Sequence, residues 1–209
     1  NAFPLASRVV GPGFPRWSPD QTMIAFHDAG ADGRPGGVFV VPARGGPPRK
    51  IAGGVFPSFS RDGQWIYFSD AVGGVPYIWK MAATGGARVK VTNGIMPIES
   101  YDGDLFYLDN LTGAGSAWRL PRGGGQAVKV VEGVISGNFD VVDGGLYYID
   151  SVSGAAGSFI DRPGRDTRLR YFDFATTRST TVAANLGMIV GATNGPGGLS
   201  ATRDGRTVL

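Results

Sequence analysis

The 209-residue sequence predicts an all-β fold built from repeated four-stranded units. Three observations carry this prediction: a recurring Asp-Gly turn (Asp-Gln in the first copy), a short aromatic and aliphatic strand directly after it, and a spacing of about forty residues between copies. The turn aspartates are Asp20, Asp62, Asp102, Asp143 and, after a longer interval, Asp204. One strand-turn-strand signature in each such interval is typical of a β-propeller whose blades are four-stranded antiparallel sheets.

The second copy shows the expected order of elements most clearly. Val55–Ser60 is a first strand, and Arg61-Asp62-Gly63 is a hairpin turn in which Asp binds backbone N–H groups and Gly accepts a positive φ. Trp65–Phe68 is apolar on both faces, as in a strand that lies between two neighbouring sheets. Tyr77–Met81 is a third strand, and Arg88–Thr92 alternates polar and apolar residues, as an outer strand does.

The other copies follow the same order, and the expected blades begin near residues 14, 55, 96, 137 and 197. The second strands of copies one, three and four are Met23–Phe26, Leu105–Leu108 and Leu146–Ile149. Copy four carries an additional loop from about Ser151 to Arg168. Copy five contributes only Gly198–Ala201, its turn and Thr207–Leu209.

Isolated strand-like segments at the two ends of the chain indicate how the propeller closes. Ala6–Val10 resembles an isolated outer strand, and it would complete the fifth blade together with the inner strands of copy five. We therefore expect one propeller domain over residues 1–209, with five blades, as a piece of a longer protein. The alternative is an arc of a propeller with six to eight blades.

Composition agrees with a turn-rich β-protein. Hydrophobic residues make up 42% of the chain and charged residues 18%. The 35 glycines and 14 prolines are about a quarter of the chain, and the glycines lie at regular turn positions between apolar strands. The chain has no cysteine, which excludes disulfides and thiolate metal sites, and no apolar stretch is long enough to span a membrane. The N-terminus has no signal-peptide pattern, and the compartment stays open between bacterial periplasm and cytoplasm.

The net charge of +3 falls short of the dense basic patch of a dedicated DNA-binding domain, so we expect no nucleic-acid binding by this domain. The most basic segment, Asp161–Arg170, contains two aspartates and a Pro-Gly turn. It reads as a solvated loop, with an anion or partner contact as the alternative.

Two segments resemble a known repeat. Pro15–Phe26 and Pro57–Phe68 resemble the TolB-type repeat, a WD-like propeller repeat of bacteria. The first copy departs from it with Gln21 where Gly is usual, and the third departs with Glu99-Ser100-Tyr101 before its Asp. The late segments 169–178 and 198–207 are similar to the C-terminal propellers of bacterial winged-helix regulators and Ser/Thr kinases. The resemblance implies a module for protein interaction or sensing, and it transfers no catalytic residue.

Several residues are of types that often act in catalysis or in binding of metals or phosphate, but each has a structural explanation. The turn aspartates are expected to satisfy hairpin N–H groups and to be held far apart by adjacent blades. His27, the only histidine, is expected to be an ordinary strand-end or loop residue, because no Gly-x-Ser-x-Gly elbow accompanies it. A sialidase would need an arginine triad and a Tyr-Glu pair, and neither can be read around Glu99 or Glu132. The glycine runs match no phosphate loop. We expect no catalytic residue, metal or cofactor.

The aromatic residues of the strands are expected to pack between blades, with a peptide groove lined by Trp79 and Trp118 as the alternative. The leading hypothesis is a non-enzymatic propeller that binds a protein or peptide or senses a ligand at its central channel. The first-strand residues Arg16, Ser58, Ile98, Asn138 and Ser200 occupy equivalent positions and are predicted to surround the channel mouth. The rival hypotheses are an accessory or gating propeller of a hydrolase or peptidase, and a propeller glycosidase or lyase. The oligomeric state stays open.

Overall fold

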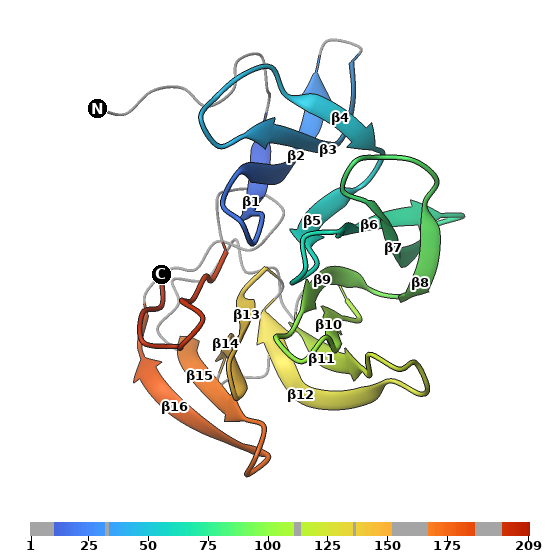
Figure 1. Ribbon diagram of the computed structural model, residues 1–209. Coiled ribbons are helices and arrows are strands. Elements are labelled where there is room, and N and C mark those ends of the chain that lie inside the picture. Colours follow the sequence, from blue (N-terminus) through green and yellow to red (C-terminus); the bar gives the residue numbers. More distant parts are fainter. Residues whose placement is uncertain (1–10, 32–33, 111–113, 136, 152–166, 187–197) are drawn as a thin grey trace. The chain divides into compact units, whose positions relative to one another are not determined.

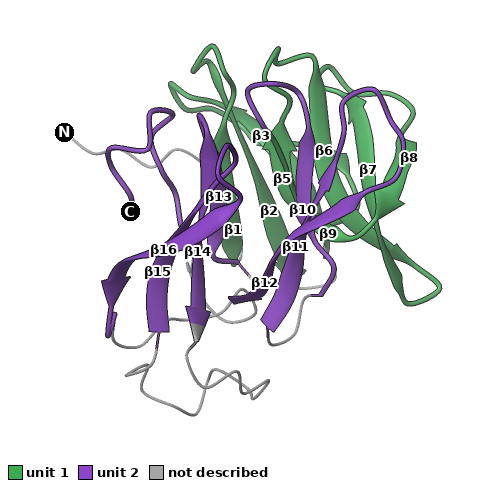
Figure 2. Cartoon of the chain, turned by 90° about the horizontal axis from the view of Figure 1, so that it is seen from below, with its two compact units in different colours: residues 1–99 green, residues 100–209 purple. Residues whose placement is uncertain are grey.

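A computed structural model of the chain describes residues 11–31, 34–110, 114–135, 137–151, 167–186 and 198–209. These residues form sixteen β-strands in four four-stranded antiparallel sheets, and no helix lies among them (Figure 1). The chain divides into two compact units, residues 1–99 and residues 100–209 (Figure 2). The all-β prediction and the four-stranded antiparallel blades are therefore confirmed.

Unit 1 contains two complete sheets and one further strand. In both sheets each strand pairs with the next along the chain, as the repeated hairpin pattern predicts. The first sheet consists of β1 (Pro12–Trp17), β2 (Met23–Ala31), β3 (Arg34–Pro42) and β4 (Arg49–Ala52). The second consists of β5 (Val55–Phe59), β6 (Trp65–Val72), β7 (Val75–Ala82) and β8 (Val89–Asn93). Strand β9 (Ile95–Glu99) ends the unit.

Unit 2 continues the same order of strands. The third sheet runs β9-β10-β11-β12, and the fourth runs β13-β14-β15-β16. Their strands in unit 2 are β10 (Leu105–Leu108), β11 (Ala114–Leu120), β12 (Val128–Ile135), β13 (Phe139–Val142), β14 (Gly145–Ser151), β15 (Thr167–Asp173) and β16 (Arg178–Ala184). The predicted second strands thus begin at or within one residue of the observed ones.

The apolar faces of the first two sheets pack against each other and form the core of unit 1. Ile66 and Phe68 on β6 are fully buried, and they pack with Ala25 on β2 and with Val38 and Val40 on β3. Each of these strands is apolar on both faces because the sheet has a neighbour to cover it, which the run Trp65–Phe68 predicts. Burial of one such side chain contributes about 1.5–3 kcal/mol to stability.

The Asp turn has the predicted hairpin geometry. In the second sheet the Ser60 backbone N–H donates to the Trp65 carbonyl oxygen at 2.9 Å, and Gly63 has a φ of 72°. The Asp62 carboxylate accepts the Ser60 hydroxyl at 2.6 Å and the Gln64 N–H at 2.9 Å. In the first copy Gln21 takes the glycine position with a φ of 59°, so the departure from the repeat is accommodated in the same left-handed conformation.

The prediction of five blades is wrong for the described residues, which contain four four-stranded sheets. The fifth Asp turn closes a short hairpin in which Ala201 and Val208 form an isolated bridge. Two such short segments cannot supply four strands. The strand expected at Ala6–Val10 and most of the loop expected from Ser151 to Arg168 lie outside the described residues.

The short hairpin packs on the fourth sheet within unit 2. The Asp140 carboxylate accepts the Ala201 N–H at 2.9 Å, and the Tyr147 hydroxyl donates to the Gly205 carbonyl oxygen at 3.0 Å. Leu199 joins Ile135 and Ile149 in a buried cluster. The hairpin is therefore held on the inner strands of the sheet that precedes it in the chain.

Gly54, at the entry to β5, should be the least replaceable of the turn glycines in unit 1. Gly54 and Gly86 both have left-handed φ angles, of 105° and 123°. A Cβ on Gly54 would lie 2.4 Å from the Ser69 carbonyl oxygen, whereas one on Gly86 would meet nothing within 4 Å. Gly86→Ala should lower the free energy of unfolding by about 1–2 kcal/mol through backbone strain alone. Gly54→Ala should lower it by more than about 3 kcal/mol.

Urea titrations followed by tryptophan fluorescence measure both variants against the unchanged chain. Equal losses for the two variants would show that the close approach of Gly54 to Ser69 has no energetic weight.

Candidate functional site

Each first strand of unit 1 carries the same backbone irregularity. Phe14, Phe56 and Met96 have φ angles of 50°, 54° and 56°, and each directly precedes a proline. The pairing of β1 with β2 and of β5 with β6 shifts register at this point, as in a β-bulge. A left-handed φ costs a non-glycine residue about 1–3 kcal/mol and persists only where the surroundings enforce it. The first strands therefore share a strained, preformed bend.

Side chains of the preceding sheet hold two of these bends, those at Phe56 and Met96. The Phe56 N–H donates to His27 Nδ1 at 3.3 Å, and the Met96 N–H donates to Ser69 Oγ at 3.0 Å. His27 on β2 follows Asp20 by the same interval as Ser69 on β6 follows Asp62. One position in the second strand of each sheet thus anchors the first strand of the next.

His27 is therefore part of the joint between two sheets, and the expectation of an ordinary strand-end residue misses this role. Its ring stacks on Phe14 at 5.6 Å and meets the edge of Phe56 at 5.4 Å. Burial lowers the pKa of His27, and the negative charge of Asp28 offsets part of this effect. Because Nδ1 accepts the Phe56 N–H, the joint requires the neutral imidazole.

Three of the predicted channel residues lie around these bends. Arg16 and Ile98 line a cavity of about 10 Å³ together with the bend residues, which has room for roughly one water molecule. The Ser58 hydroxyl is buried and donates to the Pro97 carbonyl oxygen at 2.6 Å. Arg16 is partly exposed, so it is the polar side chain of this group that faces outward.

The other two predicted residues belong to unit 2. Asn138 is buried beside the start of β13, and its carbonyl oxygen accepts the Ile149 N–H at 3.0 Å. Ser200 is exposed in the terminal hairpin, where it exchanges two backbone hydrogen bonds with Leu209. That all five residues surround one channel mouth stays a prediction.

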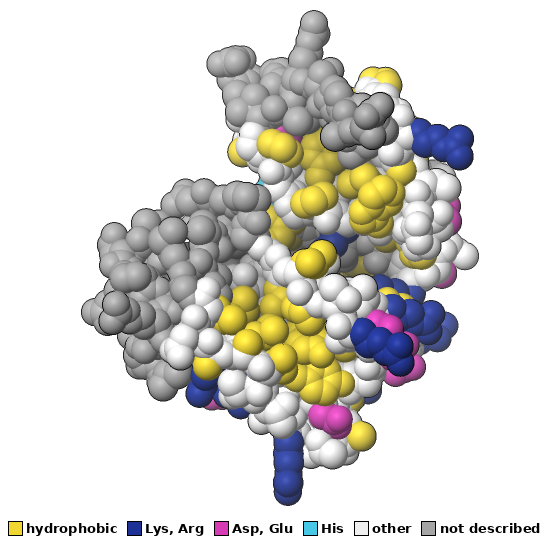
Figure 3. Space-filling model, turned by 90° about the vertical axis from the view of Figure 1, so that its left-hand side faces the viewer, with side chains coloured by type: hydrophobic (Ala, Val, Ile, Leu, Met, Phe, Trp, Pro, Cys, Tyr) yellow, Lys and Arg dark blue, Asp and Glu magenta, His cyan; other side chains and the backbone are white. Residues whose placement is uncertain are grey.

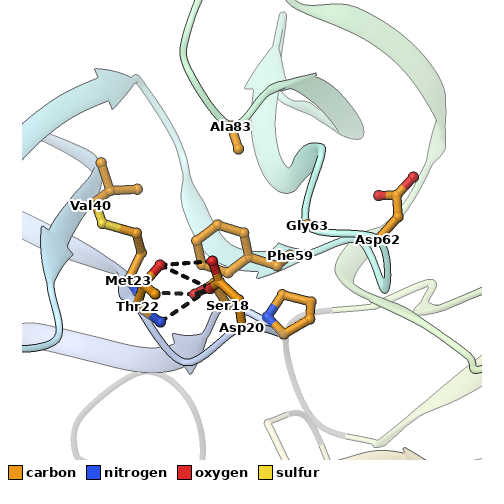
Figure 4. A pocket seen from close by; sticks show the side chains of 10 residues that line it. Ser18, Asp20, Thr22, Met23, Val40, Phe59, Asp62, Gly63 and Ala83 are labelled. Carbon is orange, nitrogen blue, oxygen red and sulfur yellow. Dashed lines mark hydrogen bonds between the residues drawn. The ribbon is translucent and has the colours of Figure 1, made fainter.

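A larger cavity lies at the turn ends of the first two sheets. It has a volume of about 220 Å³ and lies between the turn that carries Asp20 and the turn that carries Asp62 (Figure 4). Val40 and Phe59 close it on the side of the core, with the partly buried Met23 and Ala83 beside them. The two turn aspartates thus border one cavity from opposite sides, and the expectation that the turn carboxylates are held far apart stays a prediction.

A Tyr-Glu pair, which cannot be read from the sequence, forms between β6 and β9. The Tyr67 hydroxyl is hydrogen-bonded to the Glu99 carboxylate, and burial together with that charge raises the pKa of Tyr67. The Arg61 N–H donates to Glu99 Oε1 at 3.3 Å, and Arg61 Nε donates to the Glu99 carbonyl oxygen at 2.6 Å. These contacts hold β9 against the second sheet. Among the described residues, no group of three His, Cys, Asp or Glu side chains is placed to bind a metal.

The predicted packing of the aromatic residues holds only in part. Trp17, on the first strand of the first sheet, is 58% exposed, whereas Phe59 at the equivalent position of the second sheet is buried in the core. Trp79 and Trp118 are half-buried, and their indole N–H groups donate to the Asp70 carbonyl oxygen and to the Asp109 carboxylate. Trp17 is thus the most exposed tryptophan.

No family model matches the chain, and no curated protein matches its sequence. Solved structures do match. TolB from Acinetobacter baumannii matches with a TM-score of 0.66 and 18% identity over 93% of this chain and 47% of that one. A chain of the nidogen/laminin complex matches with a TM-score of 0.58 and 16% identity over 84% and 64%.

The β-propeller domain of the Trilobed protease from Pyrococcus furiosus matches with a TM-score of 0.56 and 12% identity, over 85% of this chain and 59% of that one. The fold is a TolB-like β-propeller. At these identities the likeness shows the fold alone, and the chain spans less than two thirds of each of these three proteins. In the described part of the propeller, no helix has the length and apolar character needed to cross a membrane.

The residues that sequence reasoning missed are the ones that join sheets. Alignment of the repeats would place His27 over Ser69, and Phe14, Phe56 and Met96 over one another before proline. That alignment signals a shared position, but it does not show that the position bends the backbone or binds the next strand. The partnership of Tyr67 with Glu99 leaves no signal in either repeat.

Acid should weaken the joint at His27. Because burial lowers the pKa of His27 below its value of about 6.5 in the unfolded chain, the unfolded chain binds the proton more tightly. The stability that the neutral ring contributes is complete above pH 6.5 and is lost as the pH falls through the lower pKa of the folded protein. The free energy of unfolding should therefore decrease between pH 7.5 and pH 5.5.

His27→Gln is the matched variant, because its amide oxygen accepts the Phe56 N–H without titrating. Urea unfolding at a series of pH values should give a flatter profile for His27→Gln than for the unchanged chain. Parallel profiles would contradict the assignment to His27. The aspartates with lowered pKa values, Asp20, Asp173 and Asp204, titrate at lower pH and do not enter this window.

Proposed function

We propose that the chain is a non-enzymatic β-propeller module that binds a protein or peptide at the bends of its first strands. The observation that carries this proposal is the repeated left-handed residue before proline in β1, β5 and β9, with Arg16 beside it. Strained backbone of this kind clusters at sites that bind ligands. A preformed surface also loses little conformational freedom when a peptide binds, which favours affinity.

The side chains around the bends suit a peptide ligand. Phe14 and Arg16 are partly exposed, and the neighbouring Trp17 is largely exposed. Aromatic residues and arginine are the side chains that contribute most to binding energy in protein interfaces. On the face drawn in Figure 3, hydrophobic side chains (yellow) gather in patches, and basic side chains (dark blue) lie both between these patches and at the edges of the view. Apolar patches on a protein surface commonly mark interaction sites.

An accessory role in a peptidase is the second candidate. It is favoured by the structural likeness to the propeller of the Trilobed protease and to acylaminoacyl peptidase, which matches with a TM-score of 0.57 and 11% identity. In this role the catalytic groups would belong to another domain. Incubation of the chain alone with peptide p-nitroanilides should then release no nitroaniline, and release would contradict both candidates.

A third element of the proposal concerns the protein in which this propeller occurs. The comparisons do not show the resemblance of segments 169–178 and 198–207 to the C-terminal propellers of winged-helix regulators and Ser/Thr kinases, so a sensing module attached to such a domain is proposed from the sequence pattern alone. The sequence on either side of the chain in its gene tests this directly. A hydrolase domain there would favour the peptidase role instead.

Selection from a phage-displayed library of random twelve-residue peptides tests the binding proposal. Enriched peptides should bind with micromolar affinity by isothermal titration calorimetry. Arg16→Glu should weaken them at least about tenfold, as expected when a charge within an interface is reversed. Arg49→Glu is the matched control, because Arg49 is exposed on β4 at the opposite edge of the same sheet.

Peptides that bind both variants equally would place the binding surface away from the bends. Failure to enrich any peptide over an unrelated β-protein would count against peptide binding altogether.

A further inference from the structure

The hairpin that joins β6 to β7 ends in an exposed apolar tip (Figure 1). Val72 pairs with Val75 across the turn Gly73-Gly74, and both glycines have left-handed φ angles, of 60° and 80°. Such a turn matches the twist of paired strands, so the tip is preformed. The valine side chains are 50% and 41% exposed. A Cβ on either glycine would meet nothing within 4 Å, so open space surrounds the turn.

Two aromatic side chains lie behind the tip. Alternate residues of a strand share a face, so Val75, Tyr77 and Trp79 lie on one face of β7. Tyr77 and Trp79 are half-buried, and their rings meet edge to face at 6.4 Å. Trp79 also packs against the core of unit 1. The apolar tip is therefore followed by a pair of aromatic rings held by the core.

Basic side chains cover these rings. The Arg88 guanidinium lies over the Trp79 ring at 4.2 Å, and Lys90 Nζ lies over the Tyr77 ring at 3.4 Å. Arg88 and Lys90 are both exposed. From residue 71 to residue 93 the chain has three basic residues and no acidic one. The surface behind the apolar tip is therefore positively charged.

Two kinds of surface can accept an exposed apolar tip: a hydrophobic pocket of a protein and the headgroup region of a bilayer. The positive charge favours the bilayer, because anionic lipids attract lysine and arginine near the membrane surface. Asp70 balances only Arg88, to which it is ion-paired, so the group with Lys90 keeps a net positive charge. The aromatic rings favour the bilayer as well, since Tyr and Trp are enriched at the interface between membrane and water.

We propose that the β6–β7 hairpin binds the surface of a bilayer that contains anionic phospholipids. Val72 and Val75 enter the boundary between headgroups and acyl chains. Tyr77 and Trp79 lie at the level of the headgroups, and Lys90 contacts lipid phosphate. In this arrangement the hairpin lies on the membrane and does not span it. The site goes beyond the proposed function, since it lies at this hairpin and not at the bends of the first strands.

Co-sedimentation of the chain with lipid vesicles tests the proposal. Vesicles of phosphatidylcholine with about 30% phosphatidylglycerol should bind half of the chain at about 1–10 mM lipid, weaker than the binding that a single myristoyl chain gives. Vesicles of phosphatidylcholine alone should bind at least about fivefold more weakly, because they lack the negative surface potential. Raising the salt from about 50 mM to 500 mM should weaken binding to the anionic vesicles, because salt screens exposed charges.

Substitution of both tip valines by serine, V72S with V75S, should weaken binding about tenfold, because the tip loses the apolar surface that enters the bilayer. The matched control is V128S with V182S, which replaces two equally exposed valines on the outer strands β12 and β16 and should change nothing. Because all four valines are exposed, urea unfolding should show the same stability for both double variants.

Lys90→Glu tests the charge and should weaken binding to anionic vesicles at least about fivefold. Lys129→Glu is its matched control, because Lys129 faces Trp118 on β11 as Lys90 faces Trp79 on β7. It should leave vesicle binding unchanged.

Absence of vesicle binding, equal binding to neutral and anionic vesicles, or equal effects of the hairpin variants and their controls would each overturn the proposal. Arg16→Glu should leave vesicle binding unchanged, and the serine variants should still bind the selected peptides. Failure here is therefore distinguishable from failure of the site at the first-strand bends.

Discussion

The structure depends on one constraint: the inner strands of each sheet are rich in apolar side chains, which neighbouring sheets must cover. In unit 1 this is met where Ile66 and Phe68 of the second sheet pack on Ala25, Val38 and Val40 of the first. No single hairpin could bury these side chains by itself, so the repeat is stable only as a stack of sheets. The strands, turns and bends all serve this packing.

Packing of sheets also explains the recurrent left-handed residue in the first strands. Strands β5 and β9 each follow the outer strand of the previous sheet and bend to join their own sheet, before proline at Phe56 and Met96, and β1 has the same bend at Phe14. Hydrogen bonds to His27 and Ser69 of the preceding sheet hold Phe56 and Met96 in this strained conformation. The same position thus holds a titratable ring in one copy and a neutral hydroxyl in the next. The joints between sheets therefore share one backbone arrangement but differ in whether the anchoring side chain can titrate.

The turn aspartates are structural residues that also lie at a cavity. The carboxylates of Asp20, Asp62 and Asp204 accept hydrogen bonds from N–H and hydroxyl groups of their own turns, which explains their recurrence by a structural role. Stacking of two sheets then brings the turns of Asp20 and Asp62 to the rim of one cavity. The residues around the repeated positions, such as Met23, Phe59 and Ala83, form the apolar part of its lining.

The sequence by itself determined the all-β class, the location of the strands and the Asp turns, because strand periodicity and turn chemistry are local properties of a few neighbouring residues. The sequence indicated that Arg16, Ser58 and Ile98 occupy equivalent positions, and they lie on β1, β5 and β9. It could not show that Ser58 is buried against Pro97 while Arg16 is partly exposed. Only the tertiary structure decided the number of sheets, the bends before proline, and the pairs His27 with Phe56 and Tyr67 with Glu99. The physical reason is that these features join residues from different repeats, and their contacts exist only after whole sheets have packed.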